Sequence, residues 1–486
     1  MDYYFRHEVM IMGLGTMLLC GAAVFFLFVI CFRAIKIKGK PARNDVPEVD
    51  RAISERAAKS LSAMIRYRTV SGRGETRSSF KRFTDNLRSR YAEVFKTLIE
   101  EDAGGSMLLR WMGADEEADP VLFCVNTDVV SADGTWEYEP FSGAVAENMV
   151  WGRGAIESKG VLCALMEAVE GLIANGFIPS RDIYIAIVHD AESDNEGNKQ
   201  VADIIRRRGI RLAAVFGNGN CISRDLLPAD RPQVIIGVAE KGRIKIRLSA
   251  ADNGGRTGAP PRHTVIGRLS EAICRIEFRP RPVRKSVVLR DMIDEIAPYL
   301  PFGMRIMAAN LWLFEGLFYK KMRRHGSFSS MIRTTFAETE FKAGSNENRL
   351  PSSAEAVMLG RTIHGDSCAD VFRFLLNLIE STGVQAEVVH ADEATQVSLY
   401  RGKMYDNLKK ALKESFGDIV IAPGIIADNY SLNMYRGYTE CIYRITPFIL
   451  TEDEISTIHG ANERIGIEAL GRAVVFYEKL LKNVTE

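Results

Sequence analysis

The first hydrophobic feature of the chain is an almost unbroken apolar run from Val9 to Phe32, which carries no charge after Glu8. A run of this length is sufficient for a helix to cross the hydrocarbon core of a bilayer. We therefore predict an N-terminal tail at 1–8, one transmembrane helix at 9–32 and a polar linker at 33–50. A cleaved signal peptide and a buried helix are the alternatives. The run is longer than a signal sequence and lacks a clear cleavage site, which favours the membrane span.

Basic residues follow the predicted span. They are Arg33, Lys36, Lys38, Lys40 and Arg43. Because positively charged flanks tend to stay in the cytoplasm, this asymmetry predicts a single-pass membrane protein whose globular part faces the cytoplasm.

Downstream of the linker, strand-like and helix-like segments alternate. Amphipathic helices are predicted at 55–66 and 79–100, followed by an apolar strand at 120–130, a helix at 159–176, a strand at 183–189 and a helix at 198–209. This alternation predicts an α/β structure with a largely parallel sheet. Ligands of such sheets bind beyond the carboxyl ends of the strands, where the polar sequences NTD, HDAESDNEG and GNGN stand.

The pattern changes near residue 242 to a turn-rich loop with shorter elements, and the α/β pattern returns near Cys368. We therefore predict one domain formed by 51–242 and 366–486, and an inserted α+β domain at 243–365.

Composition narrows the range of functions. The 486 residues carry a formal net charge of +1, so the chain lacks the basic footprint of a nucleic-acid-binding protein and no nucleic-acid partner is expected. The eight cysteines are scattered, mostly among apolar neighbours, which is typical of reduced core cysteines. The glycine-rich sequence GRGAIESKG has neither the phosphate-loop nor the dinucleotide spacing.

A series of short motifs occurs in a fixed order. The series reads NTDVV from Asn126, WEYEPFSG from Trp136, GRGAIESKG from Gly152, HDAES from His189, GNGN from Gly217, EKG from Glu240, GGRTGAPPRHT from Gly254, AGSNENRLP from Ala343 and HGANER from His459. In this order the motifs resemble the zinc metallopeptidase family of carboxypeptidase S, aminoacylase and succinyl-diaminopimelate desuccinylase (peptidase M20 type), most of all its carboxypeptidase S branch. The resemblance implies a three-layer α/β zinc-peptidase domain with an inserted α+β lid or dimerisation domain, and hence a homodimer. It also implies a small peptide or N-acyl amino acid as the ligand.

The same resemblance implies a zinc pair, and the residues at its positions are only partly preserved. Glu192 and His459 match ligands of one metal, and Glu157 stands where the family has the bridging aspartate. Asn126 and Gly217 replace a histidine and an aspartate that hold the other metal. An amide is a poor zinc ligand beside imidazole, and glycine offers no side chain.

Other positions of the expected site also differ from the family. Ala191 stands in the place of the general base, a loss that removes on the order of 10²–10⁴ in rate. Asp128, which orients the zinc histidine in the family, is retained. Arg256 replaces a histidine that the family contributes across its dimer. Asn348 and Arg361 match positions associated with the substrate carboxylate.

These observations support two hypotheses. The first is a pseudo-hydrolase, inactive or severely impaired in catalysis, that holds zinc at one weak site at most and either binds a small peptide or N-acyl amino acid or regulates a partner at the membrane. The second is an active metallohydrolase with a rearranged metal shell, in which Asp190, Asp194 or Glu196 supplies a missing ligand or base.

Overall fold

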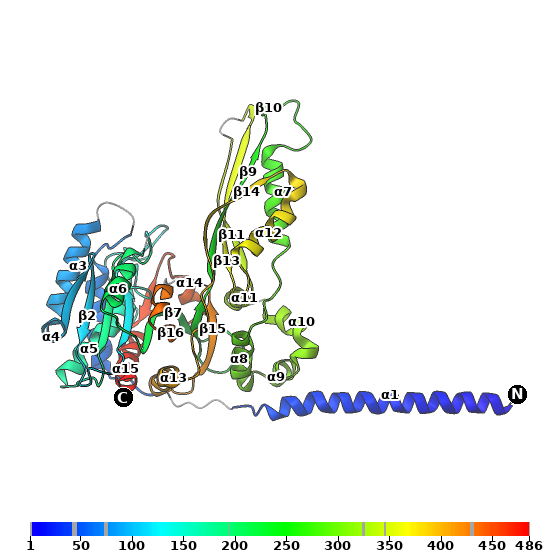
Figure 1. Cartoon of the computed structure of the whole chain (residues 1–486), viewed down its shortest axis with the longest axis horizontal. Coiled ribbons are helices and arrows are strands. Elements are labelled where there is room, and N and C mark those ends of the chain that lie inside the picture. Colours follow the sequence, from blue (N-terminus) through cyan, green and yellow to red (C-terminus); the bar gives the residue numbers. More distant parts are fainter. Residues whose placement is uncertain are drawn as a thin grey trace.

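An eight-stranded mixed sheet forms the core of the larger part of the molecule (Figure 1). The computed structural model describes residues 2–40, 46–71, 76–193, 195–322, 326–344, 347–427 and 432–485. The strands of the sheet follow the order β1 (Ile99–Ala103), β2 (Ser106–Trp111), β6 (Ile183–Val188), β3 (Val121–Asn126), β7 (Ala214–Ser223), β16 (Ile442–Leu450), β8 (Gln233–Glu240) and β15 (Val420–Ile426). β6, β3, β7 and β16 run parallel to their neighbours in this series, as do β8 and β15, whereas β2 is antiparallel to both β1 and β6.

Helices cover both faces of this sheet, which gives the three layers expected of the α/β fold. On one face, Phe123 belongs to a core shared with α2 (Arg51–Ile65), α5 (Lys159–Ala174), α13 (Lys403–Phe416) and α15 (Ile467–Val484). On the other, the neighbouring residue Leu122 packs with α6 (Glu196–Arg207) and the short helix η3 (Leu432–Gly437). Successive strand residues point to opposite faces, so apolar side chains at consecutive positions fill both cores.

The predicted helix at 79–100 is wrong in its second half. α3 spans Thr76–Arg90, a short helix α4 spans Ala92–Thr97, and β1 begins at Ile99. The carboxylate of Glu170 in α5 accepts the backbone N–H groups of Glu93 (3.3 Å) and Val94 (2.9 Å), which satisfies donors at the start of α4. These long-range contacts divide a segment whose pattern alone favours one helix.

A second, antiparallel sheet stands beside the first (Figure 1). Its order is β11 (Thr335–Ala343), β13 (Ser353–Thr362), β9 (Gly242–Ala251) and β14 (Gln385–Asp392), with α7 (Val265–Phe278) and α12 (Cys368–Ile379) packed on it. The predicted insert at 243–365 stays a prediction about domains. In the structure, two elements that follow that range join the small sheet: β14 is one of its strands, and α12 packs on it. Conversely, α8 (Val287–Ile296) lies within the range but packs against β15 of the large sheet.

Short elements complete the described chain. They are β4 (Val145–Ala146), β5 (Met149–Trp151) and β17 (Arg464–Gly466) in one small sheet, β10 (Gly255–Arg256) paired with β12 (Arg349–Leu350), the helices α9 (Phe302–Ala309), α10 (Leu311–Met322), α11 (Gly326–Ile332) and α14 (Glu452–Ser456), and the turns η1 (Ala297–Tyr299) and η2 (Glu380–Thr382).

The N-terminal helix α1 spans Asp2–Lys36 and projects from the globular part (Figure 1). Its segment Thr16–Lys36 is long and apolar enough to cross a membrane, and most of it is exposed to its surroundings. The structure supports the predicted helix, and an apolar helix this close to the N-terminus is compatible both with a membrane span and with a signal sequence.

Candidate functional site

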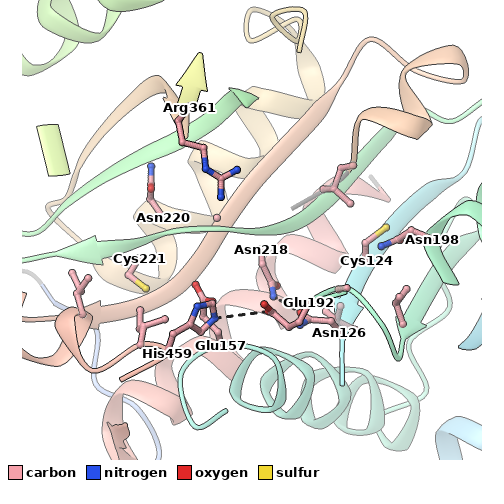
Figure 2. A pocket seen from close by; sticks show the side chains of 17 residues that line it. Cys124, Asn126, Glu157, Glu192, Asn198, Asn218, Asn220, Cys221, Arg361 and His459 are labelled. Atoms are coloured by element: carbon pink, nitrogen blue, oxygen red, sulfur yellow. Dashed lines mark hydrogen bonds and ion pairs between the residues drawn. The ribbon is translucent and has the colours of Figure 1, made fainter. Parts of the chain in front are cut away.

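A cavity of about 510 Å³ opens where β3, β6 and β7 end, next to Arg361 of β13 (Figure 2). Its lining includes Asn126, Glu157, Ala191, Glu192, Asn198, Asn218, Asn220, Arg361, Leu432 and His459. This is the edge of the sheet to which the sequence assigned the ligand site. The cavity therefore brings together residues separated by more than three hundred positions in the chain.

Three side chains in this cavity converge on one point. The Nε2 atom of His459 lies 3.2 Å from Oε2 of Glu157 and 3.8 Å from Oε1 of Glu192. One ligand atom from each of the three residues lies within 4.8 Å of the others. Bonds of about 2 Å to a tetrahedral zinc ion place ligand atoms roughly 3.3 Å apart, so small shifts suffice for these residues to hold one ion. The donor set of one nitrogen and two carboxylates suits zinc.

The proximity of Glu157 also determines the protonation of His459. The hydrogen bond with Glu157 raises the pKa of the imidazole to about 9, against the opposing effect of burial. At neutral pH the side chain of the metal-free chain is therefore the imidazolium cation, with a proton on both ring nitrogens. Because a metal ligand must be deprotonated, binding of an ion at this point requires the release of that proton.

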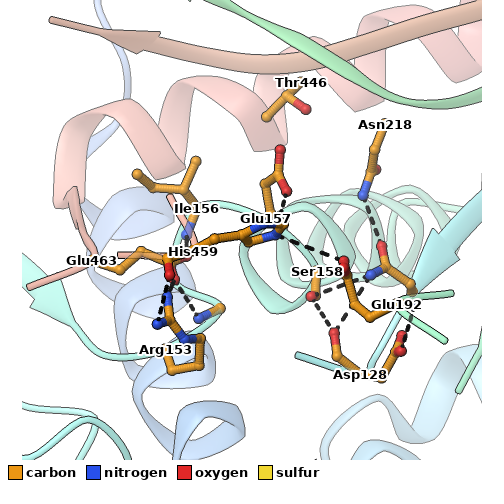
Figure 3. A network of polar contacts seen from close by, with 12 residues as sticks. Asp128, Arg153, Ile156, Glu157, Ser158, Glu192, Asn218, Thr446, His459 and Glu463 are labelled. Carbon is orange, nitrogen blue, oxygen red and sulfur yellow. Dashed lines mark hydrogen bonds and ion pairs between the residues drawn. The ribbon is translucent and has the colours of Figure 1, made fainter. Parts of the chain in front are cut away.

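A buried ion pair holds the loops that carry Glu157 and His459 (Figure 3). Glu463 accepts hydrogen bonds from Arg153 (2.8 Å) and from the backbone N–H groups of Gly154 and Ile156 (3.0 Å each). Arg153 in turn donates to the carbonyl oxygen of His459 (3.2 Å). Burial raises the pKa of Glu463, and these donors oppose the shift. The network thus joins the 153–157 loop to the 459–463 loop.

Asp128 fixes the third loop, which carries Glu192. Its carboxylate accepts the backbone N–H of Ala191 (3.1 Å) and that of Glu192 (2.8 Å), and it also accepts the hydroxyl of Ser71. Burial raises the pKa of Asp128, and the hydrogen bonds from Ser71, Glu192 and Ala191 oppose that shift. In this structure Asp128 therefore positions a backbone loop. Ala191 presents only its methyl group to the cavity.

An amide pair lies beside the carboxylate and imidazole cluster. Nδ2 of Asn218 donates to Oδ1 of Asn126 (2.8 Å), and Nδ2 of Asn126 donates to the hydroxyl of Ser158 (3.3 Å). Both asparagines are buried. Oδ1 of Asn218 is buried too and accepts no hydrogen bond from the described residues. The pair joins the end of β3 to β7, where the family resemblance places ligands of the other zinc.

Gly217 precedes Asn218 in β7, and Leu432 fills the space in front of it. A Cβ atom built on Gly217 would lie 2.6 Å from Cδ1 of Leu432. Leu432 is 2% exposed and belongs to the core under η3. An aspartate at position 217 has no room for its side chain unless Leu432 moves. The described residues therefore fit one metal ion of the expected pair, and they do not fit the second.

The remaining predicted residues take different positions. Arg361 lines the cavity, and its guanidinium group projects toward it from β13 (Figure 2). Asn348 is exposed beside β12 and does not line the cavity. Arg256 lies in β10, which pairs with β12 in the same region.

The acidic residues considered as substitute ligands are used elsewhere or lie outside the description. The carboxylate of Asp190 accepts the backbone N–H groups of Glu196 (2.7 Å) and Gly197 (3.0 Å) at the start of α6. Glu196 is exposed and pairs with Lys199. Asp194 lies outside the described residues. Asp190 therefore caps a helix, and its carboxylate is not directed at the metal cluster.

Sequence reasoning missed three contributors to the site. Asn218 was counted only as part of the altered GNGN motif, and Ser158 was not considered although its hydroxyl donates to the carbonyl oxygen of Asp128 (2.5 Å). Leu432 lies in the segment 428–435 (DNYSLNMY), which matches none of the motifs of the series. Asp428 to Ser431 of that segment lie outside the described residues.

Comparisons with known proteins identify the family and agree with the fold. The model of Peptidase family M20/M25/M40 matches residues 122–483. N-fatty-acyl-amino acid synthase/hydrolase PM20D1 of Homo sapiens is 32% identical over 384 residues, which cover 78% of this chain and 76% of that protein. Probable carboxypeptidase S-like 2 of Dictyostelium discoideum is 31% identical over 415 residues, which cover 83% and 79%. The crystal structure of an M20 family metallo-carboxypeptidase from Sulfolobus solfataricus superposes with a TM-score of 0.65 at 16% identity, covering 88% and 99%.

Proposed function

Because the chain belongs to peptidase family M20/M25/M40, we propose that it is a membrane-anchored family member that binds a small peptide or an N-acyl amino acid without efficient hydrolysis. The hydrogen bond between Asn126 and Asn218 carries this proposal. An active metal pair generates a hydroxide nucleophile between two ions, and each ion needs several strong ligands. Two neutral side-chain amides that are hydrogen-bonded to each other stand where the second ion needs its ligands, and they are poor ligands for zinc.

Two further observations support impaired catalysis. Ala191 has no group that can accept a proton from an attacking water, and no carboxylate of the described residues replaces it on that loop except Glu192, which belongs to the metal cluster. Leu432 occupies the space that a ligand at position 217 needs. The loss is therefore distributed over three elements, and one compensating side chain does not repair it.

We assign the retained cluster to zinc. Glu157, Glu192 and His459 would hold the ion, which would supply a Lewis acid for a carbonyl oxygen of the ligand. The residues of this chain would do the rest: Asp128 holds the Glu192 loop, and the pair of Arg153 and Glu463 holds the other two loops. With three protein ligands and no second ion, the site binds zinc weakly in comparison with a closed structural site.

The ligand class follows from the polar groups of the cavity. Arg361 supplies a guanidinium group, which suits the carboxylate of an amino acid or peptide. Asn220 lines the same cavity and offers a side-chain amide for the amide group of a ligand. The name of the human relative refers to N-fatty-acyl-amino acids, which contain both a carboxylate and an amide. We therefore propose an N-acyl amino acid or a small peptide with a free carboxylate as the ligand.

The second candidate is an active hydrolase with a single metal ion. The convergence of Glu157, Glu192 and His459 within 4.8 Å is the observation that favours it. A hydrolase with one metal ion would still require a general base. Glu192 would have to act either as a metal ligand and as this base, or as only one of the two.

The deciding experiment measures hydrolysis and binding on the full chain purified in detergent. N-acyl amino acids and dipeptides are offered with zinc or with a chelator, and the human relative serves as the active reference. We expect ligand binding without turnover, and loss of binding in Arg361→Ala. Arg243→Ala is the matched control. Arg243 lies opposite Arg361 in the register of β9 and β13, but its side chain is exposed and does not line the cavity. Chelator-sensitive turnover that disappears in Glu192→Ala would establish the hydrolase instead.

Membrane attachment, its orientation and self-association complete the proposal. The apolar segment Thr16–Lys36 and the basic residues after it support a single span with the globular part in the cytoplasm. The edge strand β14 exposes Val388 and Val389, which supports a homodimer through the small sheet. Protease protection of sealed vesicles tests the orientation, and the mass of the protein in lipid nanodiscs tests the dimer.

A further inference from the structure

The end of the membrane helix is packed onto the globular part. Ile30 and Ala34 of α1 are buried, and Nδ2 of Asn310 donates to the carbonyl oxygen of Ile30 (3.0 Å). Farther along, a guanidinium nitrogen of Arg305 donates to the carbonyl oxygen of Ile37 (3.3 Å). These contacts fix the helices α9 and α10 against the C-terminal part of α1. The two helices therefore have a defined position relative to the predicted span.

The packing continues into the apolar segment of α1. The rings of Phe26 and Trp312 are in edge-to-face contact, with centroids 5.8 Å apart and an interplanar angle of 88°. Phe26 lies about 9 Å along the helix axis from Phe32, the end of the apolar run, at a rise of about 1.5 Å per residue. If α1 crosses a bilayer along this axis, Trp312 lies at the depth of Phe26, below the level of the head groups.

α9 and α10 expose four large apolar side chains, one at the start of α9 and three along α10. The exposed fractions are 49% for Phe302, 57% for Trp312, 42% for Leu313 and 57% for Leu317. Helices that lie in a membrane interface bury an apolar face to a depth of about 5–10 Å. The contact with Phe26 places Trp312 in that range of depth. We name the four residues the apolar face of α9 and α10.

Exposed basic side chains stand at the ends of the helices that form and contact this apolar face. Lys320 and Lys321 are exposed in the last turn of α10, and Lys36 and Lys38 are exposed at the end of α1. Basic groups next to a buried apolar face attract anionic head groups, and their long stems allow the charges to reach the head-group layer. The arrangement of charge and apolar surface is therefore complementary to an anionic lipid leaflet.

We propose that α9 and α10 form a second membrane contact, in which the apolar face enters the leaflet beside α1 and the lysines bind anionic head groups. This contact goes beyond the proposed ligand binding, and it rests on the proposed membrane span of α1. It adds a contact with the bilayer to the packing of α1 on the globular part, so that both the helix and the domain surface beside it hold the globular part at the membrane.

The test uses the fluorescence of Trp312 in the full chain. Protein is reconstituted into vesicles of phosphatidylcholine and phosphatidylserine, with or without bromine on the acyl chains, and the signal of Trp312 is the difference between wild type and Trp312→Phe. Among the tryptophans of the chain, Trp312 is the one with a largely exposed side chain. We expect brominated lipid to quench this signal and aqueous acrylamide to leave it largely unchanged.

A moved tryptophan is the matched control. In Trp312→Phe/Ile99→Trp, the new indole stands on the exposed edge strand β1, at the end of the large sheet opposite to β15 and α8. Its signal should respond to acrylamide and not to brominated lipid. In wild type, we expect brominated lipid to quench Trp312 less in vesicles without phosphatidylserine than in vesicles that contain it. Lys320→Gln/Lys321→Gln should show the weaker quenching even when phosphatidylserine is present.

Four results would overturn all or part of the proposal. Quenching of Trp312 by acrylamide and not by brominated lipid would place the face in water. If neither acrylamide nor brominated lipid quenches Trp312, and Trp312→Ser has a smaller assembly mass in nanodiscs than wild type, the face would be assigned to contact with a second copy of the chain. Release of the chain by alkaline carbonate would show that α1 does not span the membrane, and the second contact would fall with it. Quenching that is independent of lipid charge would overturn the assignment to anionic lipid.

Discussion

The side-chain amide of Asn218 donates a 2.8 Å hydrogen bond to the amide oxygen of Asn126, so the ends of two neighbouring parallel strands are joined by neutral groups. The same cavity is lined by a cluster of two carboxylates and an imidazole (Figure 2). One half of the site therefore offers strong metal ligands, and the other half offers a hydrogen-bonded contact that needs no ion.

This division predicts the zinc stoichiometry. After dialysis against a zinc buffer, the full chain should retain one zinc ion at most, because only Glu157, Glu192 and His459 converge as ligands among the described residues. Glu192→Ala and His459→Ala should abolish retention. Asn126→Ala is the matched control and should leave it unchanged. Mass spectrometry of the metal content measures the result, and two retained ions per chain would refute the division.

The stability of the region around Gly217 should depend on Leu432. Gly217→Ala places a Cβ atom 2.6 Å from Leu432 Cδ1, so the substitution should be destabilising in wild type. Leu432→Ala should itself cost about 2–5 kcal/mol by opening a cavity. In the double variant, the loss of unfolding free energy should be smaller than the sum of the two single losses, by a coupling energy of about 0.5–3 kcal/mol. Thermal unfolding of the four proteins measures this coupling.

A control lies on the same segment as Leu432. Gly437→Ala adds a Cβ atom that meets nothing within 4 Å, so its effect should be small and additive with Leu432→Ala. Full additivity of Gly217→Ala and Leu432→Ala would mean that the leucine does not restrict position 217.

Asp128 should affect metal binding through the backbone. Asp128→Asn replaces one acceptor oxygen by a donor, so the N–H groups of Ala191 and Glu192 cannot both be accepted. Loss of such a supporting contact lowers metal affinity about 10–100-fold in comparable sites. Competition with a zinc-sensitive dye measures the affinity. Asp190→Asn is the control on the same loop and should weaken the start of α6 without changing zinc affinity.

The buried Lys159 makes stability depend on pH. Burial lowers the pKa of this amine to about 7, while Nζ donates to the carbonyl oxygen of Tyr67 (2.5 Å). In the unfolded chain the pKa is about 10.4. Between these values the unfolded state binds the additional proton, so the contribution of Lys159 to stability increases as the pH rises from about 7 toward 10. Below pH 7 both states are protonated and the full cost of burying the charge remains.

This dependence is measured against Lys159→Met. The difference in unfolding free energy between wild type and Lys159→Met should shift in favour of wild type by at most about 1.4 kcal/mol per pH unit above pH 7. Lys96→Met alters an exposed amine and should show no such slope. A flat difference for Lys159→Met would show that the amine is not held in an unfavourable environment.

Much of the fold could be predicted from periodicity and motif order. The strand at 121–126 and the helix at 159–174 were both expected, because each is a strongly apolar segment with clear boundaries. The family was identified from the motifs and is confirmed by the match to residues 122–483. The end of α3 could not be predicted, since it depends on contacts between Glu170 and the backbone of α4, far apart in sequence.

The candidate site shows the same limit. The types of residue at Glu157, Glu192 and His459 were read from motif positions, and their convergence follows from the fold. The bond from Asn218 to Asn126 and the contact of Leu432 with the Gly217 position require two strands and a distant helical turn to be placed in space. No local pattern contains that information.

Leu432 also determines which substitutions this half of the site tolerates. With the leucine packed over Gly217, an aspartate introduced at position 217 by a single substitution produces a clash and places a carboxylate against an apolar side chain. If Leu432 is replaced first, a cavity opens in the core. Either stepwise route to a carboxylate at position 217 passes through a less stable protein, so the residues at these two positions constrain each other.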